Sequence, residues 1–183
     1  MEKKKKIIFF VVICIAALFV IVLSSGVLGV PARNIEQDAR RNQKIDRAWA
    51  VSIATNDRLG AMLFYNEMLD DYVYSIYVNR EGFSFGYFFR SGGSASSTIG
   101  SGDSIMDGVH GFAYGTNGSA IISMNKSRVA EISLDNGIHV TRIDIDPTKP
   151  FAAVIPVNVD SVALYDVNGD VVPFTVIEIV ESA

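Results

Sequence analysis

The hydrophobic and polar positions divide the chain into two unlike parts. Residues 7–23 form an unbroken apolar run of 17 residues, which follows four consecutive lysines. About 20 apolar residues cross a bilayer core as a helix, because a helix satisfies its backbone groups internally. Only two serines and two glycines interrupt the apolar residues between this run and residue 30, and Pro31 then ends the stretch. The pattern therefore predicts a transmembrane signal anchor over residues 7–30.

A cleaved signal peptide is the alternative reading of this segment, with small residues at 24–26 or 30–32 as the cleavage region. The run is long for a signal peptide, and no Ala-x-Ala site follows it, which favours a retained anchor. The lysines favour a cytoplasmic N-terminus, although five basic residues in 33–47 oppose them. We expect residues 1–6 to be a basic cytoplasmic tail. The chain would then pass once through the cell membrane, with its C-terminal domain outside.

Residues 31–56 show helical periodicity. Apolar and small residues recur at i, i+3, i+4, i+7 and i+8, at Ile45, Ala48, Trp49, Ser52 and Ile53. Asn34 and Gln37 have the spacing of a capping box, and Glu36 and Arg40 have the spacing of an ion pair. We predict a juxtamembrane helix that lifts the next domain off the bilayer. A dimerising helix would need sustained heptads, which the segment lacks.

The predicted β-domain covers residues 57–183, and from Ala61 onward the pattern changes to period two. Residues 72–79 and 83–90 alternate around Arg80-Glu81-Gly82, which indicates a hairpin with an aromatic face, either core or a binding surface. A second hairpin is predicted at 129–134 and 138–145, around Asn136-Gly137, with a bulge near Thr141 or Arg142. Further short strands follow. The fold class expected for residues 57–183 is mainly β, an antiparallel sandwich or partial barrel.

Residues 91–119 separate the two hairpins and contain eight glycines and seven serines. A loop of this length is unusual in a compact domain, and such loops are often functional. We predict a short strand near Phe112 and a ligand-binding surface in this loop. The side chains assigned to that surface are Ile105, Met106, Phe112 and Tyr114.

Charge is distributed unevenly along the chain. Residues 33–47 hold five basic and three acidic residues, a net charge of +2, whereas residues 48–183 hold seven basic and 16 acidic residues, a net charge of −9. A domain this acidic repels phosphate backbones, so nucleic acid is excluded as a partner. The only cysteine, Cys14, lies in the apolar run, so the domain has no disulfide.

One short motif suggests chemistry. Gly102-Asp103-Ser104-Ile105 resembles the nucleophile block of SGNH (GDSL-type) hydrolases. The resemblance implies an esterase in which Ser104 is the nucleophile and His110 or His139 supplies the base. The sequence departs from the family because a Gly/Ser stretch precedes the block, no late Asp-x-x-His block follows, and alternating helices are missing.

No other pattern predicts a cofactor or a metal site. Asp166, Asn168 and Asp170 alternate as in a calcium loop, but the glycine is misplaced, and Asn-Gly indicates a hairpin turn. Two isolated histidines do not form a zinc site. The lysine-rich anchor and segments 84–93 and 149–151 resemble small single-pass extracytoplasmic proteins of Gram-positive bacteria, which carry no assigned function.

These observations favour a non-enzymatic envelope protein. Its partners would be the lipid bilayer, through the N-terminal helix, and another envelope component that the β-domain binds or supports. Two alternatives stay open at this point. One is an envelope esterase that uses Ser104, and the other is an accessory subunit of a membrane complex that makes contact through its anchor helix.

Overall fold

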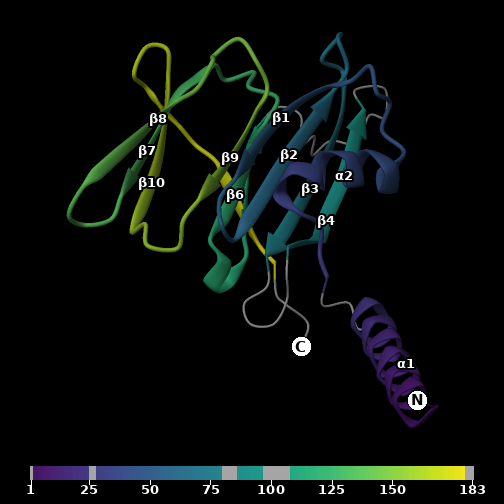
Figure 1. Ribbon diagram of the computed structural model, residues 1–183. Helices are drawn as coiled ribbons and strands as arrows, with labels where there is room; N and C mark the ends of the chain where they lie inside the picture. The colour runs from purple at the N-terminus through teal and green to yellow at the C-terminus, as the bar shows by residue number, and fades with distance from the viewer. Residues whose placement is uncertain (1, 25–27, 80–85, 97–107, 180–183) are drawn as a thin grey trace.

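The computed structural model describes residues 2–24, 28–79, 86–96 and 108–179, and shows a mainly β protein with one N-terminal helix set apart from its sheets (Figure 1). This helix, α1 (Glu2–Ser24), contains the long apolar run. Many of its apolar side chains are exposed. Within the described part of the chain, no helix combines the length and the hydropathy needed to cross a membrane.

The described strands form three sheets of four strands each. The first sheet has the order β1-β2-β3-β4 and is antiparallel throughout. Its strands are β1 (Ala50–Thr55), β2 (Leu59–Tyr65), β3 (Asp71–Asn79) and β4 (Tyr87–Ser96).

The middle sheet has the order β12-β5-β6-β9, and the third sheet has the order β11-β10-β7-β8. The strands of the middle sheet are β5 (Val109–Ala113), β6 (Ser119–Ser123), β9 (Phe151–Ile155) and β12 (Thr175–Glu178). Those of the third sheet are β7 (Val129–Asp135), β8 (Val140–Asp144), β10 (Ser161–Asp166) and β11 (Val171–Val172). The short 3-10 helix η2 (Gly115–Asn117) joins β5 to β6.

Two hydrophobic cores lie on the two faces of the middle sheet. One core joins it to the first sheet, through residues such as Leu63, Ile76 and Ile122. The other joins it to the third sheet, through residues such as Ile121 and Ile132. Neighbours in β6 therefore point into different cores, which explains why this strand is almost entirely buried. Stacking of the sheets gives each apolar strand face a partner.

The prediction of a mainly β domain with antiparallel sheets is confirmed, with one exception. β12 pairs with β5 in parallel, so the middle sheet is mixed. Both predicted hairpins exist as antiparallel pairs, β3 with β4 and β7 with β8. The turn at residues 80–82 lies outside the described residues.

The predicted bulge near Thr141 or Arg142 is wrong, because β7 and β8 pair in a continuous register. The apparent slip in the pattern has another cause. Ile138 and Val140 are exposed, whereas Ile143 and Ile145 pack against the core beside the third sheet. The predicted bulge came from treating these two exposed aliphatic residues as buried ones.

The juxtamembrane helix over residues 31–56 is also only partly correct. A 3-10 turn, η1 (Ala32–Asn34), leads into α2 (Ile35–Gln43), where the helix ends. Lys44 adopts a left-handed conformation with φ of 56°, which stops the helix, and Asn34 makes no side-chain cap. Residues 50–55 form β1 instead and pair with β2 along their whole length. Sheet pairing thus overrode the helical spacing, and the first strand begins before the predicted domain boundary at residue 57.

The Gly/Ser-rich segment 91–119 is not one long loop. Its first six residues belong to β4, and its described second half forms β5 and η2. The predicted short strand near Phe112 is confirmed as β5. Glycines suit the β4 portion because Gly93 lies against the ring of Tyr74, where an added Cβ would come within 2.8 Å of the ring.

Candidate functional site

Helix α2 covers the outer face of the first sheet (Figure 1). Ile35 and Ala39 are fully buried, and they join Met62, Phe64 and Tyr77 of β2 and β3 in a third hydrophobic cluster. These residues lie one turn apart on the helix, so one narrow stripe faces the sheet. The remaining surface of α2 is polar and faces outward.

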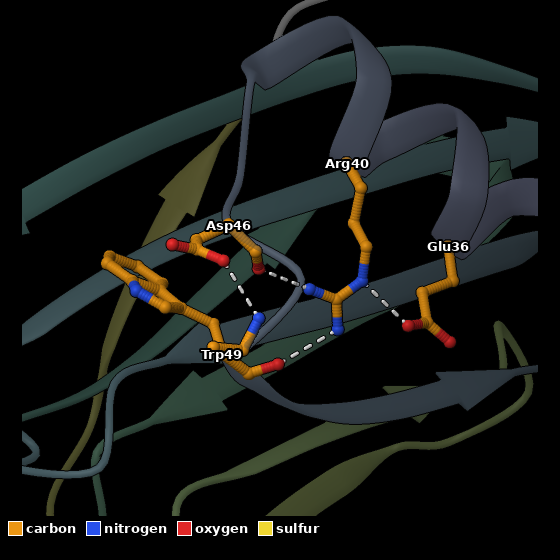
Figure 2. Close-up of polar contacts among 5 residues, drawn as sticks. Glu36, Arg40, Asp46 and Trp49 are labelled. Atoms are coloured by element: carbon orange, nitrogen blue, oxygen red, sulfur yellow. Dashed lines mark hydrogen bonds and ion pairs between the residues drawn. The ribbon is translucent and has the colours of Figure 1, made fainter.

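Arg40 connects α2 to the loop that precedes β1 (Figure 2). Its Nε donates to Glu36 Oε1 at 2.8 Å, and its two terminal nitrogens donate to the carbonyl oxygens of Asp46 (2.8 Å) and Trp49 (3.0 Å). The guanidinium also lies over the ring of Phe64, 4.8 Å from its centroid. All three nitrogens are therefore engaged, and Arg40 fixes the loop from residue 44 to residue 49.

The Asp38 carboxylate also has several partners within the protein. Its carboxylate accepts hydrogen bonds from Arg41 at 3.0 Å, Asn42 at 2.9 Å and the Tyr77 hydroxyl at 2.7 Å. Burial, and then the hydrogen bond to Asp38, raise the pKa of Tyr77 well above its usual range, so it stays a proton donor. The two acidic residues of α2, Glu36 and Asp38, thus have partners within the protein.

A polar groove of about 970 Å³ runs along α2 and the chain that leads into it. The residues lining it include four arginines, Arg33, Arg40, Arg41 and Arg47. Arg33 and Arg47 are exposed, and neither forms an ion pair with any residue that the structure describes. We call this surface the arginine groove.

The wall of the arginine groove nearest to α1 is fixed to the first sheet. Val30 and Tyr87 exchange two backbone hydrogen bonds of 2.8 Å, which adds a short bridge to the edge of β4. Gly29 packs directly on this joint, where an added Cβ would lie 2.7 Å from the carbonyl carbon of Gly86. The chain that arrives from α1 is therefore held against the domain, and only glycine fits there.

A second cavity of about 400 Å³ lies between the β2–β3 turn and the segment before β9. Tyr65, Leu69, Lys149 and Pro150 are among its lining residues. Lys149 Nζ contacts Asp146 Oδ2 at 2.9 Å, and the hydroxyl of Thr148 and then Lys149 hold the pKa of Asp146 well below its usual range. These contacts order one wall of the cavity.

The β2–β3 turn on the other side of the second cavity presents apolar side chains to solvent. Leu69, which lines the cavity, is 40% exposed, and its neighbour Met68, at the tip of the turn, is 78% exposed. Leu69 has a φ of 56°, an unusual conformation for a bulky residue. The turn holds it there, because Asn66 Oδ1 accepts hydrogen bonds from the backbone N–H groups of Asp70 and Asp71.

The structure describes only some of the site residues predicted from the sequence. Ser104, Ile105 and Met106 lie outside the described residues. Phe112 and Tyr114, assigned to a ligand-binding surface, are 2% and 1% exposed, so that assignment is wrong for both. Phe112 stacks on Tyr74, and the buried Tyr114 hydroxyl bonds to Ser91. Burial raises the pKa of Tyr114 to about 12.

The two histidines lie in different parts of the domain. His110 is half-buried on β5 of the middle sheet, whereas His139 is exposed in the turn between β7 and β8. In that turn, the N–H of Asn136 donates to the His139 carbonyl oxygen at 3.3 Å. The role of Ser104 as a nucleophile stays a prediction.

Among the described residues, no group of three or more histidine, cysteine or acidic side chains could hold a metal ion. The calcium-like spacing at residues 166–170 has a structural explanation. Asp166 Oδ1 accepts hydrogen bonds from the backbone N–H of Asn168 at 2.8 Å and of Asp170 at 2.9 Å. The bond from Asp170 is the main cause of the lowered pKa of Asp166. The carboxylate closes the β10–β11 turn.

Comparison with known proteins adds no relative, because no family model, curated sequence or solved structure matches the chain.

The arginine groove was not foreseen as a site, although the sequence contained its signal. Five basic residues fall within residues 33–47 and make this segment basic, in contrast to the rest of the domain. Four of them line the groove, because the contacts of Arg40 hold η1, α2 and the following loop together. The second cavity has no such signal, because it combines side chains about 80 positions apart.

Replacing Arg40 by Lys should lower the free energy of unfolding by about 2 kcal/mol, because an ammonium cannot reach both carbonyl oxygens at once. Glu36→Gln is the matched control, since it removes only a partly exposed ion pair and should cost less than about 0.5 kcal/mol. Urea unfolding of the detergent-solubilised full chain, followed by fluorescence of Trp49, measures both. Equal losses would show that Arg40 acts only through Glu36.

Proposed function

We propose that α1 anchors the β-domain in the cell membrane by a single pass, with the N-terminus in the cytoplasm and the domain outside. The supporting observation is the exposure of apolar side chains around the helix. Phe9, Phe10 and Leu18 are 66–68% exposed. Phe9 and Leu18 are nine positions apart and so lie on opposite sides of the helix. Exposed apolar groups in every direction suit lipid better than water.

The proposed role of the domain is non-enzymatic: it binds or supports another component of the envelope. The second cavity supports this role. Leu69 in a left-handed conformation costs about 1–2 kcal/mol, and exposure of Met68 forgoes hydrophobic burial. Strained, exposed residues held by a hydrogen-bonded turn are typical of binding surfaces. The tip of the β2–β3 turn is therefore the contact surface that we assign to the partner.

Cysteine labelling of intact cells tests the topology. In a Cys14→Ala background, Met68→Cys and Val140→Cys each place one thiol at an exposed position, in the β2–β3 turn and on β8 respectively. A membrane-impermeant maleimide should label both variants in intact cells. Labelling of both only after permeabilisation would place the domain in the cytoplasm and overturn the proposal.

The same two variants test whether a partner covers the second cavity. We expect Met68→Cys to react several-fold more slowly in intact cells than in the purified, detergent-solubilised protein, because a bound component would shield it. Val140→Cys lies in the third sheet and should react at the same rate in both settings. Unchanged rates for both thiols would remove the second cavity as a contact surface and leave the topology unaffected.

The esterase reading rests on the resemblance of Gly102-Asp103-Ser104-Ile105 alone. The Ser104→Ala variant tests this reading, because an esterase with a serine nucleophile loses its activity when that serine is removed. We expect the intact full chain to hydrolyse short acyl esters no faster than its Ser104→Ala variant. A rate above background that disappears in Ser104→Ala would make the protein an enzyme and contradict the non-enzymatic role.

A further inference from the structure

We infer that the arginine groove binds the anionic phospholipid headgroups of the membrane in which α1 is anchored. This inference rests on the proposed anchoring and adds to it a second, chemically defined contact with the bilayer. Guanidinium groups suit the task, because their planar donors match the oxygens of a phosphate.

Two of the arginines in the groove keep their positive charge available to an anion. Glu36 and Asp38 are neutralised by Arg40 and Arg41, and the Asp46 carboxylate, which is not among the lining residues, accepts a hydrogen bond from the backbone N–H of Ala48. Arg33 and Arg47 line the groove without an ion pair in the described part of the chain. The groove therefore presents unneutralised positive charge to an anion.

The rest of the domain carries a net charge of the opposite sign. Residues 33–47 carry a net charge of +2, and residues 48–183 carry a net charge of −9. An anionic surface attracts the first segment and repels the remainder. The net charge is thus opposite in the two segments, and the arginine groove includes residues 29–31, which lead in from the anchor.

The arginine groove begins close to the end of α1 along the chain. Gly29, the first residue in the wall of the groove, is five positions after Ser24, the last residue of α1. Such a segment reaches at most about 18 Å. The backbone bridge between Val30 and Tyr87 then fixes this wall to the domain. Once α1 spans the bilayer, the groove cannot move far from the headgroups.

The backbone that carries Arg33 and Arg47 is held in place. The three bonds of Arg40 and its position over Phe64 hold the loop that carries Arg47, while η1 carries Arg33 directly before α2. Both guanidinium groups therefore project from ordered backbone. A preformed set of cations loses less conformational freedom on binding than a flexible basic tail does.

The chain contains its own probe for a test. Trp49 is the only tryptophan, and its carbonyl oxygen accepts a hydrogen bond from Arg40 beside the groove. The full chain is reconstituted into vesicles that contain a dansyl-labelled lipid headgroup as the energy acceptor. One set of vesicles is zwitterionic phosphatidylcholine, and the other contains 30% phosphatidylglycerol.

Energy transfer from Trp49 should be about twofold higher in the anionic vesicles, and salt should remove the difference. The double variant Arg33→Gln/Arg47→Gln should give the zwitterionic value in both sets. The matched control, Arg128→Gln/Arg142→Gln, removes two exposed arginines at β7 and β8 of the third sheet and should behave as the unaltered protein does. Far-ultraviolet circular dichroism checks that both double variants fold.

Vesicle flotation after carbonate washing separates the two proposals. A chain that fails to float overturns the anchoring, and with it the basis of the inference. A chain that floats but shows equal transfer in both vesicle sets overturns the headgroup site alone. Loss of the difference on adding inorganic phosphate, when chloride of equal ionic strength has no effect, would assign the groove to a soluble phosphate and also overturn it.

Discussion

The Arg40 guanidinium lies over the ring of Phe64 and donates to Glu36 and to the carbonyl oxygens of Asp46 and Trp49. This arrangement fixes the direction in which the chain leaves α2, and that direction decides where β1 begins. β1 then pairs with β2 along its whole length, and the Ser52 hydroxyl accepts a hydrogen bond from Ala152 of β9. One side chain thus couples the helix, the first sheet and the middle sheet.

The stacked sheets depend on strands that are apolar on both faces. β2 sends Leu63 toward the middle sheet and Phe64 toward α2, and β6 divides its residues between the two cores that flank the middle sheet. Such strands need a partner on each side, because an exposed apolar face would cost free energy in water. Helix α2 meets that need on the outer face of the first sheet and at the same time carries the arginines outward.

Electrostatics and chain path point to one orientation of the protein. The acidic residues of α2 are neutralised internally, Arg33 and Arg47 of the arginine groove have no ion pair in the described part of the chain, and 16 of the 20 acidic residues lie in residues 48–183. The groove begins a few residues after α1, at a joint where Gly29 and Gly86 allow two backbone segments to touch. The anchor, the joint and the groove therefore form one continuous proposed membrane-facing unit, with the second cavity as a separate proposed contact surface.

The sequence by itself determined the apolar helix, the mainly β character and both hairpins, because each rests on a local pattern of side chains and turn residues. Tertiary structure decided the rest. Residues 50–55 have helical spacing but join the sheet, since a complete ladder with β2 and burial outweigh a weak local preference. Phe112 and Tyr114 resembled a surface because glycine and serine surround them, yet they fill the core between the first and middle sheets. The arginines of the groove stand out in the sequence as a basic segment, but they form a groove only because Arg40 holds α2 and its loop together.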